Sequence, residues 1–272
     1  MSRGVSSFLK YASLIGAVIV VLLPLSVVLF ASVKTREEYS TTGPLDLPQN
    51  WFNFDNFVTA AVQGDMLTGL INTSIVLVIS LAGTIFIGTM AAYAVDRFAF
   101  RGRRLVMVLF LIATLIPSVT SQVATFQIIS GLGLYNTKAA LILLFMGTDI
   151  IAIYIFIQFM QSIPISLDEA AMLDGANRWT IYWRVILPLL KPAIATVIII
   201  KGIAIYNEFY LPFLYLQSES LISTALFRFK GPFGAQWELV AAATILVIVP
   251  TVIVFVFLQR WIYKGLVSGA VK

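Results

Sequence analysis

Three ionisable side chains interrupt long apolar stretches of the sequence, and their types could serve the chemistry of moving a polar solute. They are Asp149, Lys201 and Glu208. An ion in the hydrocarbon core of a bilayer costs at least ~2.5–3.5 kcal/mol, so such residues usually form pairs or line water. If these stretches cross a bilayer, Asp149 and Lys201 both fall near its middle, and a pair between them is geometrically possible. Glu208 then lies about 10 Å nearer the outside, on nearly the same helix face as Lys201.

Two neighbours of Glu208 strengthen this pattern. Tyr206 offers an aromatic face and Asn207 offers hydrogen bonds, and a polar solute can use both. One interpretation is that Asp149, Lys201, Tyr206, Asn207 and Glu208 border a translocation path. The other is that Asp149 and Lys201 form a structural pair that fixes the packing of two spans. Polar groups in spans often satisfy neighbouring helices, so both interpretations stay open.

Several kinds of chemistry are excluded by residues that the chain lacks. It has no histidine and no cysteine, which removes the commonest general base, the commonest metal ligand and thiol nucleophiles. It has no Gly-Lys dipeptide, so it lacks the nucleotide-binding loop that ends in Gly-Lys-[Ser/Thr]. We therefore expect no enzyme, no metal site and no cofactor resident in this chain.

The composition places the chain in a membrane. Of its 272 residues 60% are hydrophobic and 11% are charged, whereas about 25% of residues are charged in an average soluble domain. The charge-free runs predict an all-α polytopic protein with six transmembrane helices in a single domain, residues 1–272. The predicted spans are residues 11–33, 70–95, 105–129, 139–160, 192–216 and 239–258. Pro117 should kink the third span or end its straight part.

The distribution of basic residues predicts the orientation. With both termini inside, 12 of the 18 Lys and Arg residues fall in cytoplasmic segments and five fall outside, which fits the excess of positive charge on the cytoplasmic side. The formal charge of +5 is explained in this way, without nucleic acid as a partner. Residues 11–33 are too long for the apolar part of a signal peptide, so we expect that span to be retained. Residues 34–65 should form an external loop.

The segment between the fourth and fifth spans, residues 161–191, is called the coupling loop below. Pro164 should end the fourth span, and Ser166 with Glu169 matches a capping box that opens a short helix. Gly175 suits the position just past the end of that helix. A second helix over residues 178–186 should end at Pro188. From the residues alone, this pair of helices could simply lie on the membrane surface.

The order of residues in the coupling loop resembles the EAA motif of the membrane subunits of bacterial ATP-binding-cassette (ABC) importers. In that family the motif forms the coupling helices that dock into a cleft of the ATPase subunit. Family members often have Ile two residues before the Leu-Pro pair, where this chain has Val185, a conservative change. The residues that match the motif, and to which the resemblance assigns coupling, are Glu169, Ala170, Ala171, Asp174, Gly175, Leu187 and Pro188.

The resemblance extends over most of residues 66–272. Residues 92–102 look like the second cytoplasmic loop of sugar-importer permeases, and residues 206–209 and 259–272 resemble the maltose-type second permease of the oligosaccharide branch. It implies a multi-pass protein of the bacterial cytoplasmic (inner) membrane, surrounded by lipid, that imports an oligosaccharide or a related polyol. It also implies four kinds of partner: a homologous permease, a dimer of ABC ATPase subunits that bind ATP and Mg²⁺, an extracytoplasmic solute-binding protein and the sugar itself.

Two alternatives to a sugar importer remain from the residues. The same architecture could carry another solute, such as a glycerophosphodiester, although a strongly basic path would be expected for it and the charges in the spans are mixed. A self-sufficient secondary carrier would need an acidic site for its coupling ion, for which Asp149 and Glu208 are candidates. That interpretation leaves the coupling loop without a role.

Overall fold

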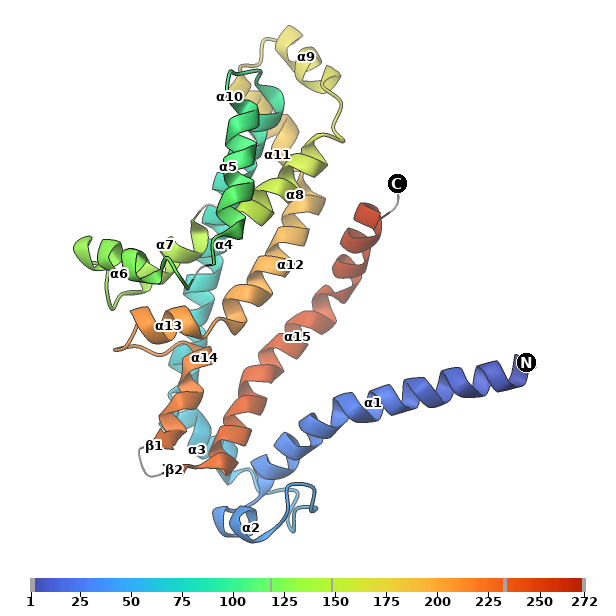
Figure 1. Cartoon of the computed structure of the whole chain (residues 1–272), viewed down its shortest axis with the longest axis vertical. Helices are drawn as coiled ribbons and strands as arrows, with labels where there is room; N and C mark the ends of the chain where they lie inside the picture. The colour runs from blue at the N-terminus through green and yellow to red at the C-terminus, as the bar shows by residue number, and fades with distance from the viewer. Residues whose placement is uncertain (1–2, 118, 148, 232–233, 271–272) are drawn as a thin grey trace. The chain divides into compact units, whose positions relative to one another are not determined.

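The computed structural model of the chain describes all residues except 1–2, 118, 148, 232–233 and 271–272. The described part is almost entirely helical, which confirms the all-α prediction (Figure 1). The described strands form one short antiparallel ladder, in which Lys230 faces Ala235 and Gly231 faces Gly234.

The elements follow one another along the chain in a fixed order. They are α1 (Arg3–Val33), α2 (Arg36–Thr41), α3 (Asp55–Gln63), α4 (Met66–Arg97), α5 (Arg103–Leu115), α6 (Gln122–Gly131), α7 (Lys138–Met146), α8 (Ile150–Met160), α9 (Ser166–Leu173), α10 (Arg178–Ile181), a π-helical turn (Tyr182–Ile186), α11 (Leu187–Leu189), α12 (Lys191–Asn207), α13 (Tyr210–Tyr215), α14 (Ile222–Ala225), a 3₁₀ turn (Leu226–Phe229), β1 (Lys230–Gly231), β2 (Gly234–Ala235) and α15 (Trp237–Ala270).

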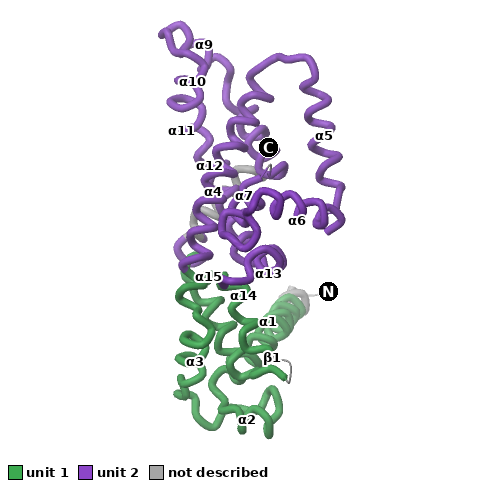
Figure 2. The backbone as a smooth tube through the Cα atoms, turned by 90° about the vertical axis from the view of Figure 1, so that its left-hand side faces the viewer, with its two compact units in different colours: residues 1–70, 221–254 green, residues 71–220, 255–272 purple. Residues whose placement is uncertain are grey.

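Two compact units share these elements (Figure 2). Unit 1 comprises residues 1–70 and 221–254, and unit 2 comprises residues 71–220 and 255–272. Helices α4 and α15 each contribute to both units. The description as a single domain therefore stays a prediction. All the candidate site residues fall in unit 2.

In unit 1, side chains from the following loop hold the C-terminal end of α1. Asn53 Nδ2 donates to the Val33 carbonyl at 3.0 Å, and Asn56 Nδ2 donates to the Lys34 carbonyl at 2.7 Å. The last carbonyls of a helix lack partners within it, so these amides supply donors that the helix itself does not. Residues 34–65, expected as an external loop, are an ordered segment that carries α2 and α3.

Three helices are each long and apolar enough to cross a membrane. They are residues Phe8–Val33 within α1, the whole of α4, and residues Trp237–Phe257 within α15. Two bent pairs raise this number to at most five among the described residues: α7 with α8, bent by 42°, and residues 178–189 with α12, bent by 69°. The stretch 105–129 is not among them, so the count of six spans stays a prediction.

The stretch 105–129 is interrupted where Pro117 was expected to act. Helix α5 ends at Leu115, and Ile116 adopts an extended backbone with ψ 117°. A proline disfavours the α conformation in the residue before it, which accounts for the extended Ile116. The prediction that Pro117 ends the straight part of this segment is confirmed.

The predicted fifth span extended too far. It was expected to reach residue 216, but α12 ends at Asn207, and Glu208 has an extended backbone with ψ 122°. Pro212 gives the physical reason, because in a continuous helix its ring would clash with the carbonyl of Glu208, four residues earlier. The chain breaks at Glu208 and starts again as α13, where Pro212 lies within the first turn and needs no N–H.

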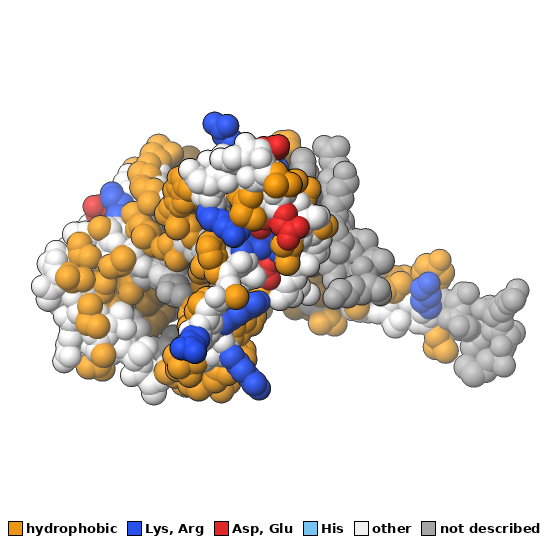
Figure 3. All heavy atoms as spheres, turned by 90° about the horizontal axis from the view of Figure 1, so that it is seen from above, with side chains coloured by type: hydrophobic (Ala, Val, Ile, Leu, Met, Phe, Trp, Pro, Cys, Tyr) orange, Lys and Arg blue, Asp and Glu red, His pale blue; other side chains and the backbone are white. Residues whose placement is uncertain are grey.

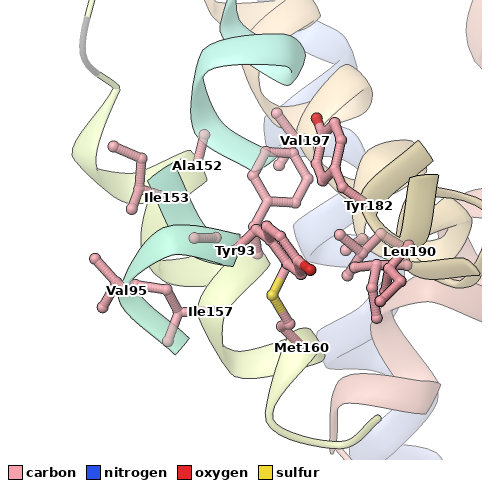
Figure 4. Packing of buried hydrophobic residues seen from close by; sticks show 14 residues of the cluster. Tyr93, Val95, Ala152, Ile153, Ile157, Met160, Tyr182, Leu190 and Val197 are labelled. Carbon is pink, nitrogen blue, oxygen red and sulfur yellow. The ribbon is translucent and has the colours of Figure 1, made fainter. Parts of the chain in front are cut away.

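The core of unit 2 lies where the coupling loop meets α4, α8 and α12 (Figure 4). Tyr93, Met160, Tyr182 and Leu190 converge there from different elements, and all four are buried. The Tyr182 hydroxyl lies 2.8 Å from Thr89 Oγ1 on α4, so the buried polar groups satisfy one another. The second half of the coupling loop is therefore built into the core.

Two local predictions for the coupling loop were wrong. Ser166 is the first residue of α9 and caps nothing, because the amides of Asp168 and Glu169 already donate to the Ile165 carbonyl, at 2.9 and 3.1 Å. Pro188 does not end the second helix, which runs on to Leu189. The preceding turn is π-helical, and Pro188 falls at the start of α11, where a missing N–H does no harm.

Candidate functional site

Helix α9 carries the first group of predicted site residues and exposes most of its surface. Glu169 and Ala170 are exposed, Ala171 is half-buried against the core, and Leu173 is 90% exposed. Figure 3 looks onto this end of the chain and shows hydrophobic and basic side chains side by side on the surface.

The end of α9 is closed as the sequence predicted. Gly175 has φ +84°, its N–H donates to the Met172 carbonyl at 3.0 Å, and the Ala176 N–H donates to the Ala171 carbonyl at 2.9 Å. These two hydrogen bonds define a Schellman motif, which needs a left-handed residue and so favours glycine. Asp174, just before Gly175, is the exposed C-cap residue. A Cβ at Gly175 would meet no atom of the described chain within 4 Å.

The remaining residues that were predicted to take part in coupling lie on α11, which follows in the same helical run. Leu187 is half-buried against the core and Pro188 is exposed. The run starts at Asn177, whose side-chain oxygen accepts from the Thr180 N–H at 2.8 Å and so caps α10. Helix α9 and the run from α10 to α11 are thus two distinct helical pieces joined through the turn at Gly175, as predicted.

A buried ion pair that was not predicted from the sequence joins α9 to the end of α4. Arg97 Nε lies 2.9 Å from Asp168 Oδ2, and the two side chains are only 3% and 2% exposed. Arg97 Nη1 donates to Asp96 Oδ2 at 2.8 Å, and Nη2 donates to the Ile163 carbonyl at 2.8 Å. The Nε–Asp168 contact lacks hydrogen-bond geometry, and no donor among the described residues makes a hydrogen bond to either Asp168 oxygen.

No sequence signal pairs these two residues. In the sequence, Asp168 is an acidic residue in the first turn of a predicted helix, and such side chains commonly stay in water, where they interact favourably with the positive end of the helix dipole. Arg97 stands close in the sequence to Arg101, Arg103 and Arg104, and a basic cluster of this kind is typical of a cytoplasmic loop. The available hint is that Arg97 is the last residue of α4 and follows its apolar run after Asp96 alone, so its long side chain can fold back against the core.

Asp149 and Lys201 come together as the sequence allowed. Lys201 Nζ lies 2.6 Å from Asp149 Oδ2, with side chains 24% and 16% exposed. The other oxygen, Asp149 Oδ1, accepts from the Ala152 N–H at 2.9 Å and caps α8. One carboxylate therefore caps the helix that restarts within the predicted fourth span, and it also neutralises a lysine of α12.

Tyr206, Asn207 and Glu208 lie where α12 ends. Glu208 Oε1 accepts from the Tyr210 N–H at 2.8 Å and the Leu211 N–H at 3.2 Å, so it holds the first turn of α13. Asn207 is exposed, and its Nδ2 donates to the Ile203 carbonyl at 3.0 Å. Tyr206 is half-buried. Both carboxylates of the predicted path thus bind the N-terminal amides of a helix that begins inside a predicted span.

Comparison with protein families gives a match over more than half of the chain. Residues 84–268 match the family model described as "Binding-protein-dependent transport system inner membrane component". The matched region includes the whole coupling loop, together with Asp149 and Lys201.

Individual relatives match nearly the full length. The chain is 32% identical over 258 residues to the melibiose/raffinose/stachyose import permease protein MelC of Bacillus subtilis (strain 168), covering 92% of this chain and 91% of the relative. It is 30% identical over 254 residues to the probable starch degradation products transport system permease protein AmyC of Thermoanaerobacterium thermosulfurigenes, with the same coverage of 92% and 91%.

A solved structure shares the fold. It is described as the crystal structure of a bacterial ABC transporter involved in the import of the acidic polysaccharide alginate. The TM-score is 0.81 at 22% sequence identity, and the match covers 96% of this chain and 98% of the other.

Proposed function

Because the chain belongs to the family of binding-protein-dependent transport system inner membrane components, we propose that it helps to import an oligosaccharide or a related polyol. It is a transmembrane subunit of an ABC sugar importer, and it is a non-catalytic permease because separate ATPase subunits hydrolyse ATP in this family. The sugars in the names of its relatives, from melibiose and raffinose to starch fragments, support this class of substrate.

The observation that carries the coupling role is the construction of α9. This helix is exposed along most of its length, closed by the Schellman motif at Gly175 and tied to the core through Asp168. A segment that passes a movement from one protein to another must offer an accessible surface and a firm base. We assign contact with the ATPase to Glu169, Ala170, Ala171, Asp174 and Gly175, and to Leu187 and Pro188 on the following run.

The working assembly contains other chains. We propose that this permease forms the pore with a homologous permease, that two ATPase subunits bind ATP and Mg²⁺ beneath the pair, and that an extracytoplasmic binding protein delivers the sugar. ATP binding would close the ATPase dimer, move the coupling loop and turn the pore outward. A ligand shifts such an equilibrium only through different affinities for the two states, so ATP and the loaded binding protein must each favour the outward-facing one.

In this assignment the protein crosses the inner membrane six times, with both termini in the cytoplasm. The excess of Lys and Arg in the predicted cytoplasmic segments supports this orientation. The break between α5 and α6 would then lie within the third span. Non-helical backbone at membrane depth is tolerated where protein buries it or where it lines a cavity, so that break is compatible with a crossing.

The translocation path is assigned to Asp149, Lys201, Tyr206, Asn207 and Glu208. The partial exposure of the Asp149–Lys201 pair and the exposed amide of Asn207 support this assignment. Hydroxyl groups of a sugar accept and donate hydrogen bonds without adding charge, which suits a path whose ionic groups already hold partners.

Purification of the tagged chain with its native gene neighbours tests the proposal. Two copies of an ATPase and one homologous permease should co-purify, and the complex in liposomes should hydrolyse ATP faster when the binding protein carries sugar. A chain that purifies alone and transports solute without ATP would contradict the proposal and make Asp149 and Glu208 ion-coupling candidates.

A further inference from the structure

Helix α9 has one buried polar side chain, and that side chain decides how the helix is attached. Asp168 is 1% exposed, whereas its neighbours Leu167 and Glu169 are exposed. A helix of eight residues has little stability of its own, so its direction depends on contacts with the rest of the protein. Its base rests on Asp168 and on the half-buried Ala171.

Arg97 provides the contact for Asp168 and reaches two other groups with the same guanidinium. Its three nitrogens face Asp168, Asp96 and the carbonyl of Ile163, each at 2.8–2.9 Å. Ile163 belongs to the short connection between α8 and α9. The planar guanidinium hydrogen-bonds to Asp96 and to the Ile163 carbonyl in a fixed geometry, and its charge attracts the Asp168 carboxylate. One side chain therefore contacts the end of α4, the connection and α9.

The charges continue from Arg97 to the start of α5. Arg103 Nη2 lies 4.0 Å from Asp96 Oδ1, and Asp96 is 8% exposed. Asp168, Arg97, Asp96 and Arg103 therefore alternate in sign across α9, α4 and α5. Removing one partner of a buried ion pair strongly destabilises the protein, because the other charge stays buried without a counter-ion. This row joins α9 to a helix long enough to cross the membrane.

We propose that Arg97 is a positioning residue that makes α9 and the C-terminal part of α4 move as one body, so that a displacement of α9 by the ATPase turns α4. This inference rests on the proposed importer function and goes beyond the EAA residues to a contact outside the motif. A bond that only stabilised the fold would leave the ratio of sugar moved to ATP hydrolysed unchanged. A joint that transmits movement sets that ratio.

The test uses the complete complex, purified with its ATPase and reconstituted in liposomes with the sugar-loaded binding protein. Asp168→Asn and Arg97→Gln should still assemble and hydrolyse ATP, with the sugar transported per ATP reduced about tenfold, within the usual range of coupling between two sites. The double variant should be no worse than the more severe single variant, because the two residues act as a unit. Arg97→Lys keeps the charge without the fork and should recover only part of the ratio.

Matched controls change the same charges elsewhere. Arg101→Gln removes an exposed arginine four residues from Arg97, and Asp55→Asn removes an exposed carboxylate in α3. Both should keep the wild-type ratio of sugar to ATP. The proposal is overturned if Asp168→Asn or Arg97→Gln assembles and keeps that ratio too. Failure of the wild-type complex to show ATP-dependent uptake would instead refute the proposed function.

A distance measurement covers variants that fail to assemble. The chain has no cysteine, so spin labels can be placed at Ser166→Cys in α9 and Ile87→Cys in the C-terminal part of α4, both exposed positions. The distance between the labels in the otherwise wild-type complex should be the same without nucleotide and with ATP bound. A change of that distance between the two states would show that α9 moves independently of α4 and would overturn the proposal.

Discussion

Asp149 makes two bonds at once: one carboxylate oxygen lies 2.6 Å from Lys201 Nζ, and the other caps α8 through the Ala152 N–H. The two roles depend on different properties of the side chain. Pairing needs the negative charge, whereas capping needs only an oxygen that accepts a hydrogen bond. Substitutions can therefore separate the two roles.

The first prediction concerns this pair. Lys201→Met leaves the carboxylate without its counter-ion, and breaking a buried pair in this way costs about 3–5 kcal/mol; the partial exposure of both side chains places this case toward the lower value. Asp149→Asn keeps an oxygen that can cap α8, but it leaves Lys201 without its counter-ion. The double variant Asp149→Asn with Lys201→Met removes both charges and keeps the cap. We expect each single variant to lower the thermal unfolding midpoint of the purified complex and the double variant to restore it.

Sugar uptake by the double variant then separates the path from a structural pair. If these residues border the path, uptake stays below wild type although assembly is normal. If the double variant recovers both the wild-type thermal midpoint and wild-type sugar uptake, Asp149 and Lys201 form a structural pair and do not border the path. Exchanging the two charges is a poorer test, because a lysine at position 149 has no oxygen with which to cap α8.

The second prediction concerns Gly175, whose φ of +84° is tolerated by aspartate and asparagine better than by other side chains. A side chain there would point into open space on the chain itself, at the surface assigned to the ATPase. Gly175→Asp should insert and assemble but abolish coupled transport, because it adds a negative charge beside Asp174. Gly175→Asn has nearly the same shape without the charge and should retain most of the uptake.

The comparison of these two variants is informative in either direction. Equal loss in both would attribute the effect to the backbone turn and not to the charge. Wild-type uptake by Gly175→Asp would show that this turn does not face the ATPase.

The long helices and the closure of α9 were predictable because both depend on local sequence. Continuous apolar residues favour long helices in a membrane, and glycine takes the left-handed position after a helix at little cost. The breaks at Asp149 and Glu208 were missed because hydropathy does not show which carboxylate will bind a helix N-terminus. The Arg97–Asp168 contact joins residues far apart in the sequence, so only the packing of α9 against α4 reveals it.

The third prediction tests the break after α12. Glu208→Gln keeps an oxygen for the Tyr210 and Leu211 amides, whereas Glu208→Ala removes it, which costs about 1 kcal/mol for a helix cap. The alanine variant should lower the thermal midpoint of the complex more than the glutamine variant. If Glu208 also borders the path through its charge, Glu208→Gln should reduce sugar uptake at normal stability. Equal stability of the two variants would contradict the capping role.

The fourth prediction concerns the contact between α4 and α8. A Cβ at Gly88 would lie 3.0 Å from the Phe156 ring, a side chain that is fully buried, so the two helices approach closely only because position 88 has no side chain. Forcing extra atoms into a packed core costs about 1–3 kcal/mol. Gly88→Leu should therefore reduce the yield and the thermal midpoint of the assembled complex. Gly16→Leu in α1 is the matched control, because a Cβ there meets no atom within 4 Å in the described chain.

Because α8 leads into the coupling loop, a Gly88→Leu complex that still assembles should also show a reduced ratio of sugar to ATP. Normal stability and a normal ratio in that variant would mean that the close approach of α4 and α8 is dispensable.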